Sequence, residues 1–193
     1  MHNYESTFGH LPPAAIRDES GNPLLSWRVA ILPYVEADNL YRQMRLDEPW
    51  DSPHNRQFLD QMPAVFRSPT QERSANTTYY RVFVGPGTAF ERDGMRLIDM
   101  YNGTANVIGV IEAGEAVPWT KPDELEYRPG EPLPPLGGIF RSESWLDRQR
   151  NKKDLIQAAM MDGTVLRFQR NFDEVEMRRF IVRNGAMPKF RDE

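Results

Sequence analysis

The sequence contains no cysteine and only three histidines among its 193 residues. Without cysteine the chain cannot form a disulfide, and it offers neither a thiolate metal ligand nor a cysteine nucleophile. It also lacks any apolar run near the ~20 residues that a membrane-spanning helix needs. Its first residues lack the basic and apolar regions of a signal peptide. These absences exclude several kinds of site and leave the compartment open.

The charge balance shows no excess of positive charge. Lys and Arg number 24 against 28 Asp and Glu, which gives a formal net charge of −4, so the sequence carries no electrostatic footprint for nucleic acid. With 39% hydrophobic and 27% charged residues, the composition is typical of a soluble globular protein. We expect one domain over residues 1–193, with a helix- and loop-rich part at 1–69 and a sheet plus C-terminal helix at 70–193.

The familiar catalytic motifs are missing as well. The glycines of Gly85-Pro86-Gly87-Thr88-Ala89-Phe90 follow a predicted strand, but Phe90 occupies the third glycine position of a dinucleotide fingerprint. A turn is the better interpretation of that segment. The chain also has no Walker A loop, no G-x-S-x-G elbow and no H-E-x-x-H motif. We therefore expect a protein that is not an enzyme and needs no cofactor.

The clearest local pattern is a β-hairpin near the C-terminus. Two alternating apolar runs meet at Asp162-Gly163, a pair that favours the two-residue type I′ turn because both turn positions need a positive φ. That turn would pair Met161 with Thr164 and Ala159 with Leu166.

The remaining patterns predict an α+β fold. We expect a mostly antiparallel sheet from residues 77–84, 106–112 and the hairpin at 155–169, with short N-terminal helices and a capped C-terminal helix at 173–184. Residues 1–9 indicate the last turns of a helix that stops at Gly9. Residues 95–100 indicate a short strand, and 117–138, with six prolines, a long extended loop.

One candidate site follows the strand predicted at 106–112. Glu112 and Glu115 stand at its expected end, close to Trp119. Two carboxylates beside an aromatic ring can perform general acid–base chemistry or hold a sugar, since loops at strand ends often present functional groups. The alternative is a strand end with solvated acids and a tryptophan that covers the edge of the core.

A second candidate is acidic. Asp47, Glu48 and Asp51 can supply oxygen ligands to Ca²⁺, although their spacing is not that of an EF-hand. Trp50 and His54 lie beside them, but no other histidine stands at ligand spacing from His54, so a structural role is the simpler interpretation.

Several blocks resemble one known family, the planctomycete prepilin-like proteins that carry the domain of unknown function 1559. The blocks are His2-Asn3-Tyr4, Leu11-Pro12-Pro13-Ala14, Leu25-Ser26-Trp27-Arg28-Val29-Ala30-Ile31-Leu32-Pro33-Tyr34, Leu46-Asp47-Glu48-Pro49-Trp50-Asp51-Ser52-Pro53-His54-Asn55 and Met161-Asp162-Gly163-Thr164-Val165. In that family a histidine stands ten residues before the hairpin aspartate. This chain has Lys152 there and so departs from the motif.

The resemblance implies a pilin- or pseudopilin-like head that follows an apolar anchor helix. On that basis we expect a non-enzymatic, extracytoplasmic or cell-surface protein that acts in pilus-type assembly or secretion, with other copies or pilin-like subunits as partners. The alternative is a carbohydrate- or calcium-binding module that uses residues 112–121. A hydrolase that uses Glu112 and Glu115 is a third hypothesis, without an accompanying motif.

Overall fold

The computed structural model describes residues 1–68, 75–138 and 155–185. Lys152, most of the polar loop expected at 71–76 and the charged stretch 141–154 fall outside these ranges. The secondary-structure elements are, in chain order, α1 (His2–Phe8), β1 (Ala15–Arg17), β2 (Pro23–Ser26), α2 (Trp27–Ala30), η1 (Leu32–Tyr34), α3 (Asp38–Tyr41), η2 (Asn55–Gln61), η3 (Ala64–Phe66), β3 (Thr77–Arg81), β4 (Phe83–Val84), η4 (Leu97–Asp99), η5 (Thr104–Asn106), β5 (Ile108–Pro118), β6 (Leu125–Glu126), β7 (Leu155–Met160), β8 (Val165–Gln169) and α5 (Glu174–Ile181).

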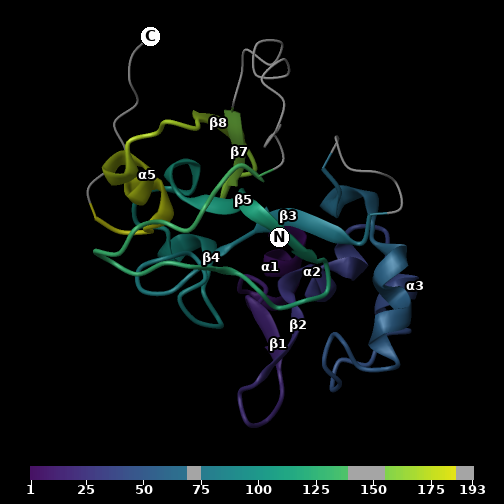
Figure 1. Cartoon of the computed structure of the whole chain (residues 1–193). Coiled ribbons are helices and arrows are strands. Elements are labelled where there is room, and N and C mark those ends of the chain that lie inside the picture. Colours follow the sequence, from purple (N-terminus) through teal and green to yellow (C-terminus); the bar gives the residue numbers. More distant parts are fainter. Residues whose placement is uncertain (69–74, 139–154, 186–193) are drawn as a thin grey trace, which may run out of the picture.

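A four-stranded antiparallel sheet with the order β3-β5-β7-β8 forms the centre of the fold, which confirms the predicted α+β class. Figure 1 shows the short N-terminal helices on one side of this sheet and α5 beside β7 and β8. The β1–β2 hairpin and a two-stranded parallel pair, β4–β6, add two small sheets. None of the helices in the described part of the chain has the length and hydrophobicity that crossing a bilayer requires.

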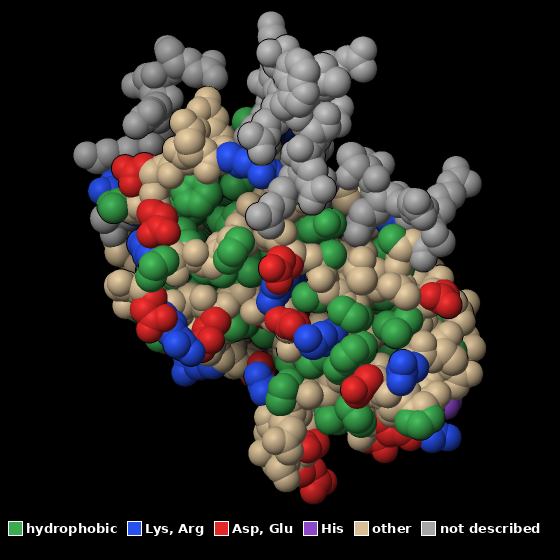
Figure 2. All heavy atoms as spheres, viewed as in Figure 1, with side chains coloured by type: hydrophobic (Ala, Val, Ile, Leu, Met, Phe, Trp, Pro, Cys, Tyr) green, Lys and Arg blue, Asp and Glu red, His purple; other side chains and the backbone are tan. Residues whose placement is uncertain are grey.

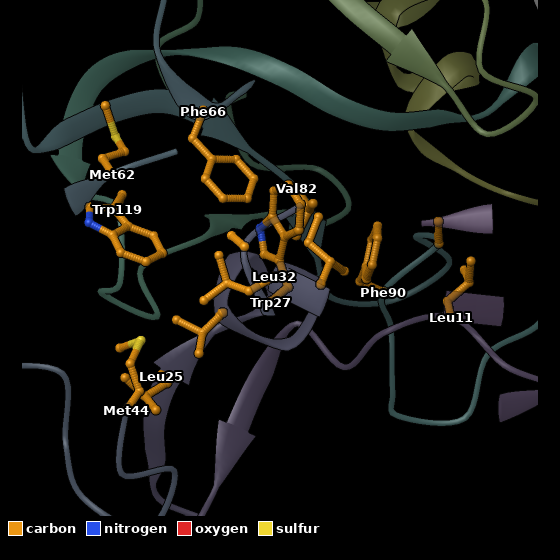
Figure 3. Packing of buried hydrophobic residues seen from close by; sticks show 14 of the residues in the cluster. Leu11, Leu25, Trp27, Leu32, Met44, Met62, Phe66, Val82, Phe90 and Trp119 are labelled. Atoms are coloured by element: carbon orange, nitrogen blue, oxygen red, sulfur yellow. The ribbon is translucent and has the colours of Figure 1, made fainter. Parts of the chain in front are cut away.

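Two clusters of buried apolar side chains stabilise the fold. The larger one joins the N-terminal helices and loops to Val107, Met161 and Trp119, and Figure 3 shows part of its packing. The smaller one includes Ile108 and Ile111 of β5, together with Met177 of α5. Because successive side chains of a strand point to opposite faces, the sheet can contribute to both clusters.

Strand β5 is longer than the sequence predicts. It continues to Pro118, because Thr77 and Thr78 of β3 pair with Pro118 and Val117. Glu112 and Glu115 therefore lie within the strand, and the prediction that they follow its end is wrong. The run 77–84 also divides, since β4 leaves the main sheet to pair with β6.

The hairpin is present, but its predicted register is wrong by one residue. Ala159 pairs with Val165, and the loop holds three residues, Met161, Asp162 and Gly163. Only Gly163 has a positive φ, of 91°, and the Asp162 carboxylate accepts the Thr164 N–H at 2.8 Å. A three-residue loop needs one left-handed residue instead of two, so glycine alone suffices. It also leaves Met161 free to enter the larger core cluster.

The helix ends mostly follow the sequence. Gly9 terminates α1 with a φ of 75°, and the Asp173 carboxylate caps α5 by accepting the Val175 N–H. The strand predicted at 95–100 is wrong, because this segment forms the 3₁₀ turn η4. There the Asp99 carboxylate accepts the Arg96 N–H at 2.9 Å, which favours a local turn over strand pairing.

Candidate functional site

The best candidate site is an apolar groove of about 420 Å³ that lies between the sheet and the N-terminal helices. We call it the sheet groove. Its lining combines Met1 and His2 with residues of α2 and η3, two residues that flank η1, and residues of all four strands of the main sheet. The lining residues are Met1, His2, Trp27, Ile31, Val35, Val65, Phe66, Tyr80, Gly109, Val110, Gln157, Ala159, Met160, Met161, Gly163 and Val165. A concave, mostly apolar surface with few polar groups is the usual form of a binding site.

Small residues and exposed apolar residues both occur along the groove. Ala159 places only a methyl group on this face of β7, whereas a Cβ at Gly109 would lie 3.0 Å from the Met161 sulfur. Val65 and Val165 are each 58% exposed, which is unusual for valine. The groove is thus continuous with apolar surface that the described residues leave uncovered, as is common at interaction sites.

A buried carboxylate lies below one end of the sheet groove. Glu112 is two residues beyond Val110 on β5 and pairs with Tyr80, so it shares their face of the sheet. It is 1% exposed and does not line the groove itself. Its Oε2 accepts the backbone N–H of Gln157 at 2.9 Å. Burial raises the pKa of the Glu112 carboxyl, while the Gln157 N–H and the charge of Arg170 oppose the shift.

The position of Glu112 has a structural cause. β7 pairs with β5 only as far as Ile111, and beyond that point Leu136 bridges to Ala113 from the same side. The Gln157 N–H lies where the two strands separate, and the Glu112 carboxylate takes the place of the missing backbone acceptor.

The Glu112→Gln variant is therefore expected to be at least as stable as the natural protein at pH 8. Glutamine keeps an acceptor for the Gln157 N–H and removes the cost of burying a charge. The natural Glu112 stabilises the fold most below its unfolded pKa of about 4.3, and that contribution is lost as the pH rises through the raised folded pKa. Urea unfolding at pH 4 and pH 8 should show a difference between the two proteins that grows with pH. Glu112→Ala, the control that lacks the acceptor, should lose about 1–3 kcal/mol.

A larger cleft of about 630 Å³ lies between the β1–β2 hairpin and residues 90–93 and 121–126, and its lining is strongly charged. Most of these charges already have partners. Asp123 pairs with Arg81 and Lys121, and Glu124 pairs with Arg28. Figure 2 likewise shows both signs interspersed on the face viewed there. Charges that are already satisfied offer little to a ligand, so this cleft is the weaker candidate although it is larger.

The structure does not gather Glu112, Glu115 and Trp119 into one surface site. Trp119 is fully buried, donates its Nε1–H to the Leu59 carbonyl at 3.0 Å and stacks on Phe66 with 6.0 Å between ring centroids. Figure 3 shows it within the core. Its indole is therefore inaccessible to a sugar ring. Glu115 is exposed, whereas Glu112 is buried.

The segment with Trp50, Asp51 and His54 is held by a residue that sequence reasoning overlooked. The Asn55 amide is fully buried, donates to the Arg45, Glu48 and Pro49 carbonyls, and accepts the Arg45 N–H at 3.0 Å. One side chain thus closes the loop by satisfying four backbone groups. The signal for it was the unusual density of turn-forming residues before Asn55.

The acidic residues of this loop face solvent or pair locally. Glu48 pairs with Arg45 at 2.7 Å, and Asp51 is exposed. His54 contacts the Gln43 carbonyl through Nε2 at 2.8 Å, while Trp50 donates its backbone N–H to Leu24. The described residues contain no group of three or more side chains that could hold a metal ion.

The sequence could not reveal the sheet groove. Its lining comes from six separate stretches between Met1 and Val165, and in each stretch the apolar residues look like ordinary core positions. Only the packing shows that Val65 and Val165 remain exposed.

The fold and the groove together define an α+β protein with an open apolar surface on one side of an antiparallel sheet. The chain belongs to the family described as protein of unknown function (DUF1559), whose model matches residues 1–107. This range includes the Ser26-Trp27-Arg28-Val29 and Asp47–Asn55 blocks, while the hairpin block lies beyond it. Neither the curated proteins nor the solved structures include a match to the chain.

Proposed function

We propose that this protein is a non-enzymatic, extracytoplasmic structural or assembly protein of the pseudopilin type. The observation that supports it best is the position of the sheet groove, whose lining includes Met1 and His2 at the start of α1. Figure 1 shows the N-terminus near β3 and β5, and Met1 lines the same groove as residues of both strands. An apolar helix that precedes α1 would therefore find an apolar surface beside its path.

The chemistry of the groove suits such a helix. The lining contains one histidine, His2, and no Asp, Glu, Lys or Arg. A helix that covered Val65 and Val165 would remove their exposed apolar surface from water. Each Å² removed would stabilise the contact by about 25 cal/mol. The small side chain of Ala159 would permit close contact with a helix backbone.

The proposed role also fits the absence of a catalytic arrangement around the groove. Glu112 is covered and bonded to a backbone N–H, and no nucleophile lies next to a base among the groove-lining residues. The alternative, a carbohydrate- or calcium-binding module at residues 112–121, has no supporting contact in the structure.

The gene's upstream coding sequence and the location of its product test this proposal. We expect a basic leader and ~20 apolar residues before the present chain, and a product in the membrane or surface fraction. In that full-length protein, Ala159→Glu should reduce surface assembly severely, because it places a charge in the groove. Val175→Glu, an exposed position on α5, is the matched control and should assemble normally. A gene that encodes no upstream apolar helix, with a product that stays cytoplasmic, would refute the proposal.

A further inference from the structure

A cluster of aromatic rings lies on the surface around α1, and none of its residues lines the sheet groove. Tyr4 is its centre. Its ring centroid lies 4.5 Å from Phe8, 5.7 Å from Tyr34 and 5.9 Å from His10. Phe8 is 54% exposed, and Tyr4, Tyr34 and His10 are half-buried. So much accessible aromatic surface in one place is uncommon outside interaction sites.

Three phenol groups converge in this cluster. Burial raises the pKa of Tyr4, and the neighbouring phenols of Tyr41 and Tyr34 raise it further. Burial and Tyr34 act on Tyr41 in the same way. The hydroxyls of Tyr4 and Tyr41 thus keep their protons at neutral pH, and each of the three phenols can both donate and accept hydrogen bonds. Within the described residues none of them makes a hydrogen bond to the protein.

His10 adds one more polar group with a defined orientation. Its Nδ1 lies 2.8 Å from the Leu11 carbonyl, so Nδ1 carries the proton and donates it. The other ring nitrogen, Nε2, is then an acceptor. The cluster therefore combines ring faces with hydroxyl and imidazole groups at their edges.

The charge around the cluster disfavours an anionic ligand. The carboxylate of Asp93 is close enough to raise the pKa of Tyr4. A negatively charged group bound beside Tyr4 would be repelled by that carboxylate.

We propose that Tyr4, Phe8, His10, Tyr34 and Tyr41, which we call the aromatic face, bind a neutral carbohydrate. A sugar ring has an apolar C–H face and a rim of hydroxyls. The apolar face can lie on the exposed Phe8 ring and the half-buried Tyr4 ring, and the hydroxyls can bond to the phenol groups, which have no hydrogen bond to the described residues. The inference uses no part of the sheet groove and does not depend on the proposed function.

Affinity electrophoresis of the full 193-residue chain tests this site. Each gel contains one neutral polysaccharide: hydroxyethyl cellulose, glucomannan, laminarin or glycol chitin. At least one of these neutral polymers should retard the natural protein. Phe8→Ala should weaken the apparent affinity about tenfold, because it removes the most exposed ring face. Tyr34→Phe keeps the ring, removes one hydroxyl and should weaken binding about fivefold.

Tyr101→Ala is the matched control, since Tyr101 is 69% exposed and lies outside the aromatic face. It should bind like the natural protein, and circular dichroism should show that all three variants stay folded. Free migration of the natural protein in all four gels would overturn the inference. The inference would also fail if Phe8→Ala were retarded as strongly as the natural protein. It would fail as well if dextran sulfate retarded the natural protein and the neutral polymers did not.

Discussion

Replacing Arg28 by methionine is expected to lower the free energy of unfolding by about 3–5 kcal/mol at pH 8, because it leaves the buried Glu124 without its partner. The Arg28 side chain is completely buried, and that of Glu124 is 4% exposed. Their charged groups lie 3.0 Å apart. Burial lowers the pKa of Arg28 and raises that of Glu124, while their mutual attraction opposes both shifts.

Arg28 also joins segments that are far apart in the sequence. Its Nε donates to the Trp119 carbonyl at 2.8 Å, and its two terminal nitrogens donate to the carbonyls of Tyr80 and Lys121. These bonds connect α2 to β3 and to the chain that follows β5. Methionine fills similar space but offers no donor, so the buried Trp119 carbonyl and the partly buried carbonyls of Tyr80 and Lys121 would lose a partner as well.

The loss in Arg28→Met should shrink as the pH falls. Without the guanidinium, the Val82 N–H at 2.9 Å and the charge of Arg81 still oppose the effect of burial, but the largest opposing interaction is lost, so the folded pKa of Glu124 should rise further. A carboxyl with a raised folded pKa destabilises the fold above that pKa and ceases to do so below the unfolded value of about 4.3. Urea unfolding of both proteins at pH 8, 6 and 4.5 measures this trend.

Glu124→Gln is the control that separates charge from packing. It keeps the shape of the side chain and leaves the Arg28 charge buried, and arginine cannot lose its proton in this range. Because glutamine does not titrate, this variant should lack the gain in stability at low pH that Glu124 is expected to contribute in Arg28→Met. A loss below about 1 kcal/mol for Arg28→Met at pH 8 would contradict the account, since that is the range of exposed pairs.

Local chemistry explains which parts of the fold the sequence could reveal. Ser26 and Asp173 cap their helices, and their side chains accept the N–H groups that the capping rule requires. Gly9 ends α1 as its flexibility suggests. In each case the determining contact lies within three or four residues, so a short stretch of sequence contains all the information.

The register of the hairpin shows where such reasoning ends. Asp162-Gly163 fits a two-residue turn locally, but Met161 donates its N–H to the Val107 carbonyl and packs in the larger core cluster. Val107, which lies 54 residues away and directly before β5, thereby helps to select the three-residue loop. Because tertiary contacts fix register wherever one face is buried, the turn sequence alone could not decide it.

The burial of the candidate site residues also depends on contacts with distant parts of the chain. In the sequence, Glu112 and Trp119 both stand near the end of a predicted strand, where functional groups are often exposed. In the structure both are buried, and β5 extends beyond its apolar run to Pro118. The extension depends on pairing with Thr77 and Thr78. Strand ends that are defined by a partner, and not by a turn residue, are therefore poor guides to exposed functional groups.

The second large effect is expected for Gly85→Ala, which should destabilise the fold by at least about 3 kcal/mol. Gly85 follows β4 with a φ of +118°, and a Cβ there would lie 2.3 Å from the Tyr127 carbonyl oxygen. The atoms that would have to move belong to the backbone. In the natural protein the Tyr127 N–H donates to the Val84 carbonyl at 2.8 Å, so relief of the clash would separate β4 from β6.

Gly130→Ala provides the control for backbone strain alone. Gly130 has a φ of +87°, and a Cβ there would meet nothing within 4 Å. Its cost should be about 1–2 kcal/mol, the penalty of a left-handed residue without a clash. Thermal and urea unfolding of the two variants side by side should therefore give a clearly larger loss for Gly85→Ala. The larger loss expected for Gly85→Ala comes only from the clash with Tyr127. Equal losses in the two variants would therefore mean that the close approach of Tyr127 to Gly85 does not hold β4 and β6 together.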